Sequence, residues 1–121
     1  MAVDDEIDPS AIERLERLGG RSFVARVVGA FLRDAPQKVA GARAALESQD
    51  VEALAASGHG LISSAGNLGA NGVSELRRNI ERAAHGGHWD ILPGMVTRLE
   101  TAFASVQARL TEYVDEARSS K

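Results

Sequence analysis

Apolar residues recur every three or four positions along most of the chain, which is the spacing of one face of an α-helix. The longest run contains Leu92, Val96, Leu99, Phe103, Val106, Leu110 and Tyr113. No stretch of the sequence shows the sustained alternation that is typical of a half-buried strand. The pattern therefore predicts an all-α protein.

Capping residues, glycines and prolines divide the first half of this pattern into helices. We expect a short helix from Asp8, a good N-cap with proline after it, to the Gly19-Gly20 pair, which ends it. A second helix follows Ser22. Pro36 cannot continue the hydrogen-bond ladder, so it predicts a break before a third helix that fades by Gln49. The second and third segments also fit one long kinked helix.

The second half of the chain contains three further predicted helices. Asp50 is expected to cap a helix that ends near Leu68, Asn71 or the glycine after it opens the next, and Asp90 caps the last. The connections are only a few residues long, so successive helices should pack antiparallel. The predicted architecture is an up-and-down four-helix bundle with one or two additional N-terminal helices.

Length and composition narrow the class of protein. A chain of 121 residues is one domain, expected to span residues 1–121, of which the acidic residues 1–7 are predicted to be a flexible tail. The net charge of -3 disfavours nucleic acid as a partner, and the chain has no cysteine. No apolar run approaches the ~18 residues that span a membrane, and the N-terminus lacks the features of a signal peptide. We expect a cytoplasmic monomer.

One histidine is predicted to face solvent from the helix after Asp50. At about 100° per residue, His59 lies roughly 150° from the centre of the apolar stripe of that helix. Its neighbours on the helical wheel are all very small: Ala55, Ala56, Ser63 and Gly66. Gly58 and Gly60 flank it in sequence, although glycine costs a helix about 1 kcal/mol relative to alanine. The small residues favour close approach of another protein, whereas a surface histidine without a role is the plainer alternative.

Other uses of histidine have less support. No second histidine or carboxylate lies three or four residues from His59, which disfavours a metal site, and no orienting carboxylate or obvious pocket supports acid-base catalysis. His85, His88 and Asp90 could suggest a metal site, but they lie in a turn between helices without a fourth ligand, so loop and cap roles are the simpler interpretation. Trp89 is expected to anchor the core or the turn. The charges of Arg77, Arg78, Glu81 and Arg82 are most simply a solvated helix face.

Residues 59–70, HGLISSAGNLGA, resemble the signature of histidine-containing phosphotransfer (HPt) domains, which reads roughly H-x-L-K-G/S-S-x-x-N-L-G-A. The match covers His59, Leu61, Ser64 and the closing Asn-Leu-Gly-Ala of residues 67–70. The predicted helices and the segments FLRDAPQ, EALA and GGHWD also look like features of this family.

The resemblance implies a role in a bacterial multistep phosphorelay. His59 would accept a phosphoryl group from an aspartate of a receiver domain and pass it to another receiver, without kinase activity in this chain. The partners would be receiver domains of response regulators and of a hybrid histidine kinase. The chain would bind no metal or other cofactor, since Mg²⁺ would sit on the receiver. The docking surface would include Ala55, Ala56, Gly60, Ile62, Ser63 and Gly66.

The chain departs from the family at Ile62, where the family usually has a lysine that can stabilise the phosphoryl charge. Residues 51–68 contain no Lys or Arg. Either a cation comes from elsewhere, with Lys38, Arg43, Arg77 and Arg78 as candidates, or the domain transfers slowly. An alternative function is therefore a pseudo-HPt module that binds a receiver or kinase without efficient transfer. Ile62 also fits an apolar contact with a particular receiver.

Overall fold

The computed structural model describes residues 4–56 and 58–119, and these residues confirm an all-α fold. The helices are α1 (Pro9–Glu47), α2 (Val51–Ala56), α3 (Gly58–Asn67), α4 (Asn71–His85) and α5 (Leu92–Ser119). Within the described residues, no helix combines the length and the apolar character that crossing a membrane requires.

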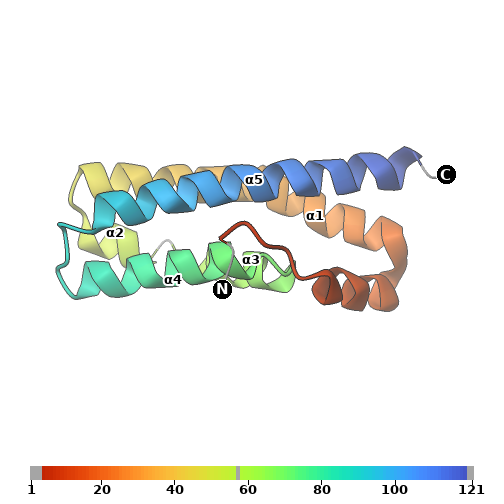
Figure 1. Ribbon diagram of the computed structural model, residues 1–121, viewed down its shortest axis with the longest axis horizontal. Coiled ribbons are helices and arrows are strands. Elements are labelled where there is room, and N and C mark those ends of the chain that lie inside the picture. Colours follow the sequence, from red (N-terminus) through yellow and green to blue (C-terminus); the bar gives the residue numbers. More distant parts are fainter. Residues whose placement is uncertain (1–3, 57, 120–121) are drawn as a thin grey trace.

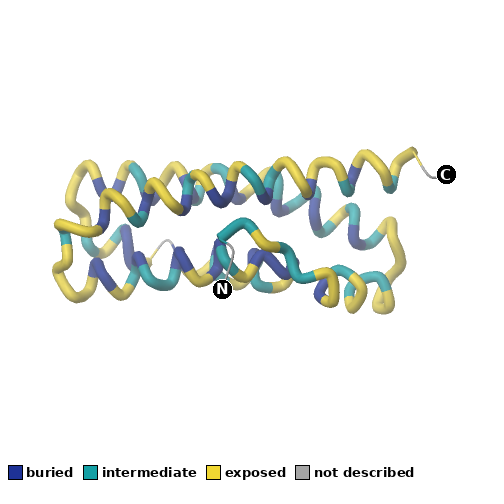
Figure 2. Tube along the Cα trace, viewed as in Figure 1, coloured by how far each residue is buried: buried dark blue, intermediate teal, exposed yellow. Residues whose placement is uncertain are grey.

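The helices form an antiparallel bundle, as the short connections predict (Figure 1). The long part of α1 packs against α5, and α4 packs against α2, α3 and α5. Buried residues lie on the inward faces of both layers (Figure 2). The core consists mainly of Leu, Val and Ala side chains, with one aromatic pair, Phe31 and Phe103, whose ring centroids are 6.0 Å apart. Such a core suits closely packed helices because small side chains let the backbones approach.

Helix α1 differs from the predicted break at Pro36 and follows the alternative of one long helix. It begins as expected, with the Asp8 carboxylate accepting a hydrogen bond from the Ser10 N–H. The one residue inside it with non-helical angles is Gly20, at φ 82° and ψ 178°, so the predicted stop at the glycine pair is a sharp bend. Pro36 is tolerated because buried residues continue on both sides of it, including Phe31 and Val39. Packing of this face offsets the lost backbone hydrogen bond.

The stretch around His59 is helical over the described residues Val51–Ala56 and Gly58–Asn67, in agreement with the predicted helix. Asp50 caps its start, since its Oδ1 accepts a hydrogen bond from the Ala53 N–H at 3.0 Å. Residue 57, between α2 and α3, lies outside the described residues. The last helix also begins slightly later than expected. The carbonyl of Ile91 accepts from the Met95 N–H at 3.2 Å, which gives Ile91, and not Asp90, the N-cap position.

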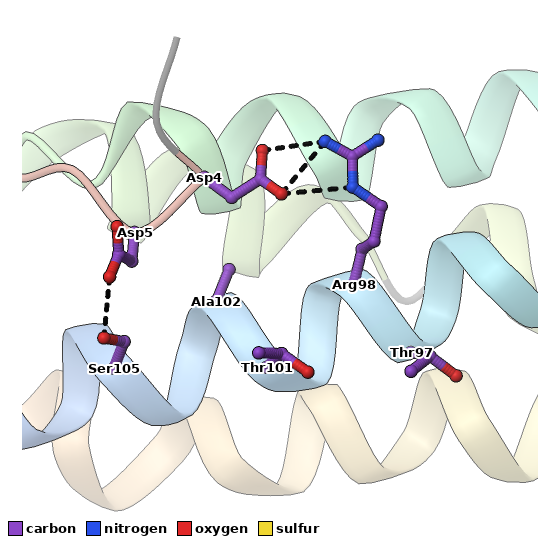
Figure 3. Close-up of a pocket in the computed structure, with 7 residues that line it drawn as sticks. All are labelled: Asp4, Asp5, Thr97, Arg98, Thr101, Ala102 and Ser105. Carbon is purple, nitrogen blue, oxygen red and sulfur yellow. Dashed lines mark hydrogen bonds and ion pairs between the residues drawn. The ribbon is translucent and has the colours of Figure 1, made fainter.

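Residues 4–7 differ from the expected flexible tail. The Asp4 carboxylate accepts hydrogen bonds from Nε and Nη2 of Arg98 at 2.9–3.1 Å (Figure 3). Asp5 accepts a 2.7 Å hydrogen bond from the Ser105 hydroxyl. On α4, a Cβ at Gly72 would lie 2.2 Å from the Asp4 carbonyl oxygen, so this close approach needs glycine. The acidic segment is thus tied to α4 and α5, while residues 1–3 lie outside the described part of the chain.

Candidate functional site

His59 lies on α3 and points into solvent. Its side chain is 77% exposed, which confirms the orientation that the helical wheel predicts. The large residue that follows, Leu61, is fully buried, as are Leu54 and Leu68. The apolar stripe therefore anchors the helix to the core and leaves the imidazole outside it.

The histidine borders a shallow surface cavity of about 400 Å³ where three helices meet. The lining residues are Glu52, Ala55 and Ala56 of α2, His59 of α3, and Glu81 and His85 of α4. The sequence around His59 does not reveal this cavity, because Glu81 and His85 are distant from His59 in the chain. The cavity is open and acidic on its rim, which suits contact with another protein better than enclosure of a small molecule.

The sequence-based expectation that no carboxylate orients His59 is wrong. Glu81 Oε1 lies 3.7 Å from His59 Nε2, and the glutamate side chain is only 20% exposed. The distance exceeds that of a hydrogen bond but is within reach of an ion pair when the imidazole is protonated. The Glu81 carboxylate therefore faces Nε2 and lies close enough to influence how the ring is oriented.

Arg77 is not part of a solvated helix face, as the charge pattern of α4 suggested. Arg77 is fully buried, and its Nη2 donates a hydrogen bond to the Leu54 carbonyl of α2. Burial lowers the pKa of the Arg77 guanidinium from its usual range, and the nearby Glu81 carboxylate acts in the opposite direction. Arg78 behaves as predicted, pairing at the surface with Glu75 at 2.9 Å. One face of α4 thus carries a buried cation next to Gly58, the residue before His59.

Two glycines beside His59 make room for cations of neighbouring helices. A Cβ on Gly58 would lie 2.9 Å from Arg77 Cζ, and a Cβ on Gly60 would lie 2.7 Å from Lys38 Nζ. Gly58 is buried, so it offers no open surface, whereas Gly60 is exposed. The glycines therefore serve internal packing as well as the predicted access to the histidine.

The expected docking residues differ in their exposure. Ala56, Gly60 and Ser63 are exposed, Ile62 and Gly66 are half-buried, and Ala55 is 7% exposed at the floor of the cavity. Ser74 of α4 donates a 2.9 Å hydrogen bond to the Ile62 carbonyl, and a Cβ on Gly66 would lie 3.7 Å from the same hydroxyl. Ile62 and Gly66 thus lie toward α4, and the most exposed part of the expected docking surface is around Ala56, Gly60 and Ser63.

The four candidate cations lie in different surroundings. Lys38 reaches Gly60, next to His59, and Arg77 lies beneath Gly58. Arg43 is committed elsewhere, because its guanidinium holds Glu100 of α5 with two hydrogen bonds of 2.7 and 3.1 Å. Only Lys38 therefore combines proximity to α3 with access to the surface.

The glycine turn before α5 contains no metal site in the described residues, where no group of three or more His, Cys, Asp or Glu side chains could hold an ion. The His88 ring packs over Gly86, where a Cβ would lie 2.7 Å from its Cδ2. His85 lies apart from it, on the cavity of His59. Trp89 is half-buried against the core, as expected for an anchor of the turn.

Comparisons with known proteins identify a family and a fold. The family model of the Hpt domain matches residues 26–119. The fold is similar to the crystal structure of histidine-containing phosphotransfer protein B (HptB) from Pseudomonas aeruginosa PAO1, with a TM-score of 0.85 and 20% sequence identity over 91% of this chain and 95% of that chain. No curated protein matches the sequence.

Proposed function

The chain belongs to the Hpt domain family, which has a phosphotransfer role in two-component signalling, and from this premise we propose that His59 is its phosphoacceptor. His59 would take a phosphoryl group from a receiver aspartate and pass it to a second receiver. The observation that carries the proposal is the 77% exposed imidazole of His59, in the family signature, on a helix whose large residues are buried. The rigid helix would keep the imidazole of His59 exposed to solvent, where a receiver domain could bind over it.

The chemistry needs one imidazole nitrogen with a free lone pair. A nitrogen of the exposed imidazole would attack the phosphorus, and the Glu81 carboxylate, 3.7 Å from Nε2, lies close enough to orient the ring. A new N–P bond forms, the O–P bond of the aspartyl phosphate breaks, and the aspartate leaves as a carboxylate with the bonding electrons. Glu81 acts here as a positioning residue.

The partner completes the site. Phosphoryl transfer passes through a loose transition state, so most of the catalysis is positioning and neutralisation of charge. We assign Mg²⁺ to the receiver. The receiver would dock over Ala56, Gly60 and Ser63, with Ala55, Ile62 and Gly66 at the border of the contact. Small side chains in the centre of this surface let the two active groups come within bonding distance.

The pseudo-HPt alternative rests on Ile62 and on the acidic cavity. Glu52 and Glu81 both border the cavity of His59, and two carboxylates oppose a phosphoryl group that carries about two negative charges. A domain of this kind would bind a receiver and transfer poorly. Ile62→Lys separates the two functions, because a large gain from a near-zero start supports the binding module.

The test is transfer of labelled phosphate from a panel of phosphorylated receivers to the purified domain. The unmodified domain and a His88→Gln control, altered in the turn outside the cavity, should both become labelled. His59→Ala should not. Persistent labelling of His59→Ala would rule out the assignment, and robust labelling of the unmodified domain would rule out the pseudo-HPt alternative.

A further inference from the structure

The charges that surround His59 are unevenly placed. Glu52 and Glu81 lie on the side of α2 and α4, around the cavity that His59 borders. Lys38 lies on the other side, where α1 packs against α3, with its ammonium at Gly60. An incoming anion at the histidine therefore meets carboxylates on one flank and an ammonium on the other.

The Lys38 ammonium lies close to His59 on the flank formed by α1. Gly60 has no side chain to separate the ammonium from His59, its neighbour in sequence, and a Cβ there would be 2.7 Å from Nζ. Lysine carries its charge on a flexible four-carbon stem with three rotatable donors. A short movement of the Lys38 side chain would therefore bring its ammonium to an anion on the adjacent imidazole.

The ammonium is also uncommitted. In the described part of the chain, Arg43 and Arg98 are held by Glu100 and Asp4, whereas Lys38 has no carboxylate within 4.0 Å. Asp34, one turn earlier on α1, borders the same cavity of about 270 Å³ between α1 and α3, together with Ser64 and Asn67. Lys38 thus sits among polar groups without being neutralised by one of them.

We propose that Lys38 contacts the phosphoryl group on His59 and supplies, from α1, the positive charge that position 62 lacks. This inference rests on the proposed phosphoacceptor role of His59. The ammonium would donate charge-assisted hydrogen bonds to the phosphoryl oxygens, both during transfer and in the phosphorylated domain. Ile62 then leaves the chemistry intact, because the cation approaches from the opposite side of α3.

The first experiment measures transfer from a phosphorylated receiver to three variants. Lys38→Gln should slow transfer roughly tenfold, the lower end of what a hydrogen bond to a charged group contributes. Lys38→Arg should retain most of the rate because it keeps the charge. Lys38→Gln combined with Ile62→Lys should recover part of the loss. Arg33→Gln, which removes an exposed cation of α1 that lies over Gly29, is the matched control and should change nothing.

A second experiment needs no receiver. Phosphoramidate is used to phosphorylate the isolated domain, and the phosphorus signal that is absent from His59→Ala is followed by ³¹P NMR against pH. A nearby cation favours the dianion, so it lowers the pKa of the phosphoryl group. Lys38→Gln should raise that pKa by roughly half a unit. Gly60→Ala should act in the same direction by displacing the ammonium, whereas Gly41→Ala, at an open position of α1, should not.

The two experiments fail in different ways. Identical ³¹P titrations of the unmodified domain and Lys38→Gln would overturn the role of Lys38, whatever the receivers do. Failure of every receiver to label the unmodified domain would instead count against the proposed phosphorelay function. A Lys38→Arg variant as slow as Lys38→Gln would show that the side chain acts through packing and not through charge.

Discussion

Gly58 of α3 and Arg77 of α4 share one small volume. The guanidinium lies where the side chain of any other residue at position 58 would begin, 2.9 Å from a Cβ built on the glycine. Because the guanidinium is buried and bonded to the Leu54 carbonyl, it cannot simply swing into solvent. The glycine before His59 is therefore a packing requirement.

Gly58→Ala should destabilise the domain. Overpacking costs about 1–3 kcal/mol, more than the ~1 kcal/mol that alanine gains over glycine in a helix. Gly41→Ala is the matched control, because a Cβ there meets nothing within 4 Å and should stabilise α1. Chemical denaturation measures both variants. Equal stabilities of the two would contradict the steric account.

Arg77→Ala should lower the free energy of unfolding by about 3 kcal/mol, because it opens a cavity and removes the hydrogen bond to Leu54. Arg77→Met should cost much less, since an apolar side chain of similar length fills the same space without the penalty of a buried charge. Urea titration of the two variants separates volume from charge. If methionine is as damaging as alanine, the hydrogen bond to Leu54 outweighs the packing.

Glu81→Ala should slow phosphoryl transfer to the domain by about tenfold, since the ring then loses the group that orients it. Glu81→Gln should lie between this variant and the unmodified protein, because the amide keeps the size and the polar oxygen of the side chain but loses its charge. Glu75→Ala, which breaks a surface pair with Arg78, is the control and should leave transfer unchanged. A rate that is insensitive to Glu81 would remove its positioning role.

Acid should weaken the contact between α1 and α5. The Arg43 hydrogen bonds hold the pKa of the Glu100 carboxyl below its usual 4.5. In the unfolded chain Glu100 binds its proton at the higher pH, so its stabilisation is present above about pH 4.5 and is lost as the pH falls through the folded pKa. Glu100→Gln should therefore flatten the acid side of the stability profile, measured by denaturation from pH 3 to pH 6.

The sequence predicts which face of each helix is buried better than it predicts which residues of other helices lie against that helix. The spacing of Leu54, Leu61 and Leu68 correctly places His59 outward, and Asp8 and Asp50 mark two helix starts. Helical periodicity says which side of a helix is buried, but it does not say which residues of other helices lie beside the histidine.

Glu81, Lys38 and Arg77 reach the surroundings of His59 only through the packing of α1 and α4 on α2 and α3. Nothing in their local sequence distinguishes them from solvated charges. The glycines on both sides of His59 were the one available signal, since each marks a place where another side chain comes close. Pro36 misleads for a related reason, because the packing of α1 offsets a local preference for a break.

The anchorage of Arg77 has a consequence for local opening of the fold. The Leu54 carbonyl of α2 is held by the Arg77 side chain of α4, and Leu54 itself is fully buried. If α2 opened by itself, it would lose both this hydrogen bond and the burial of Leu54, so α2 and α4 should open as one cooperative unit. The Leu54 amide proton, which bonds to the Asp50 carbonyl, should then exchange with deuterium as slowly as those at the centre of α4.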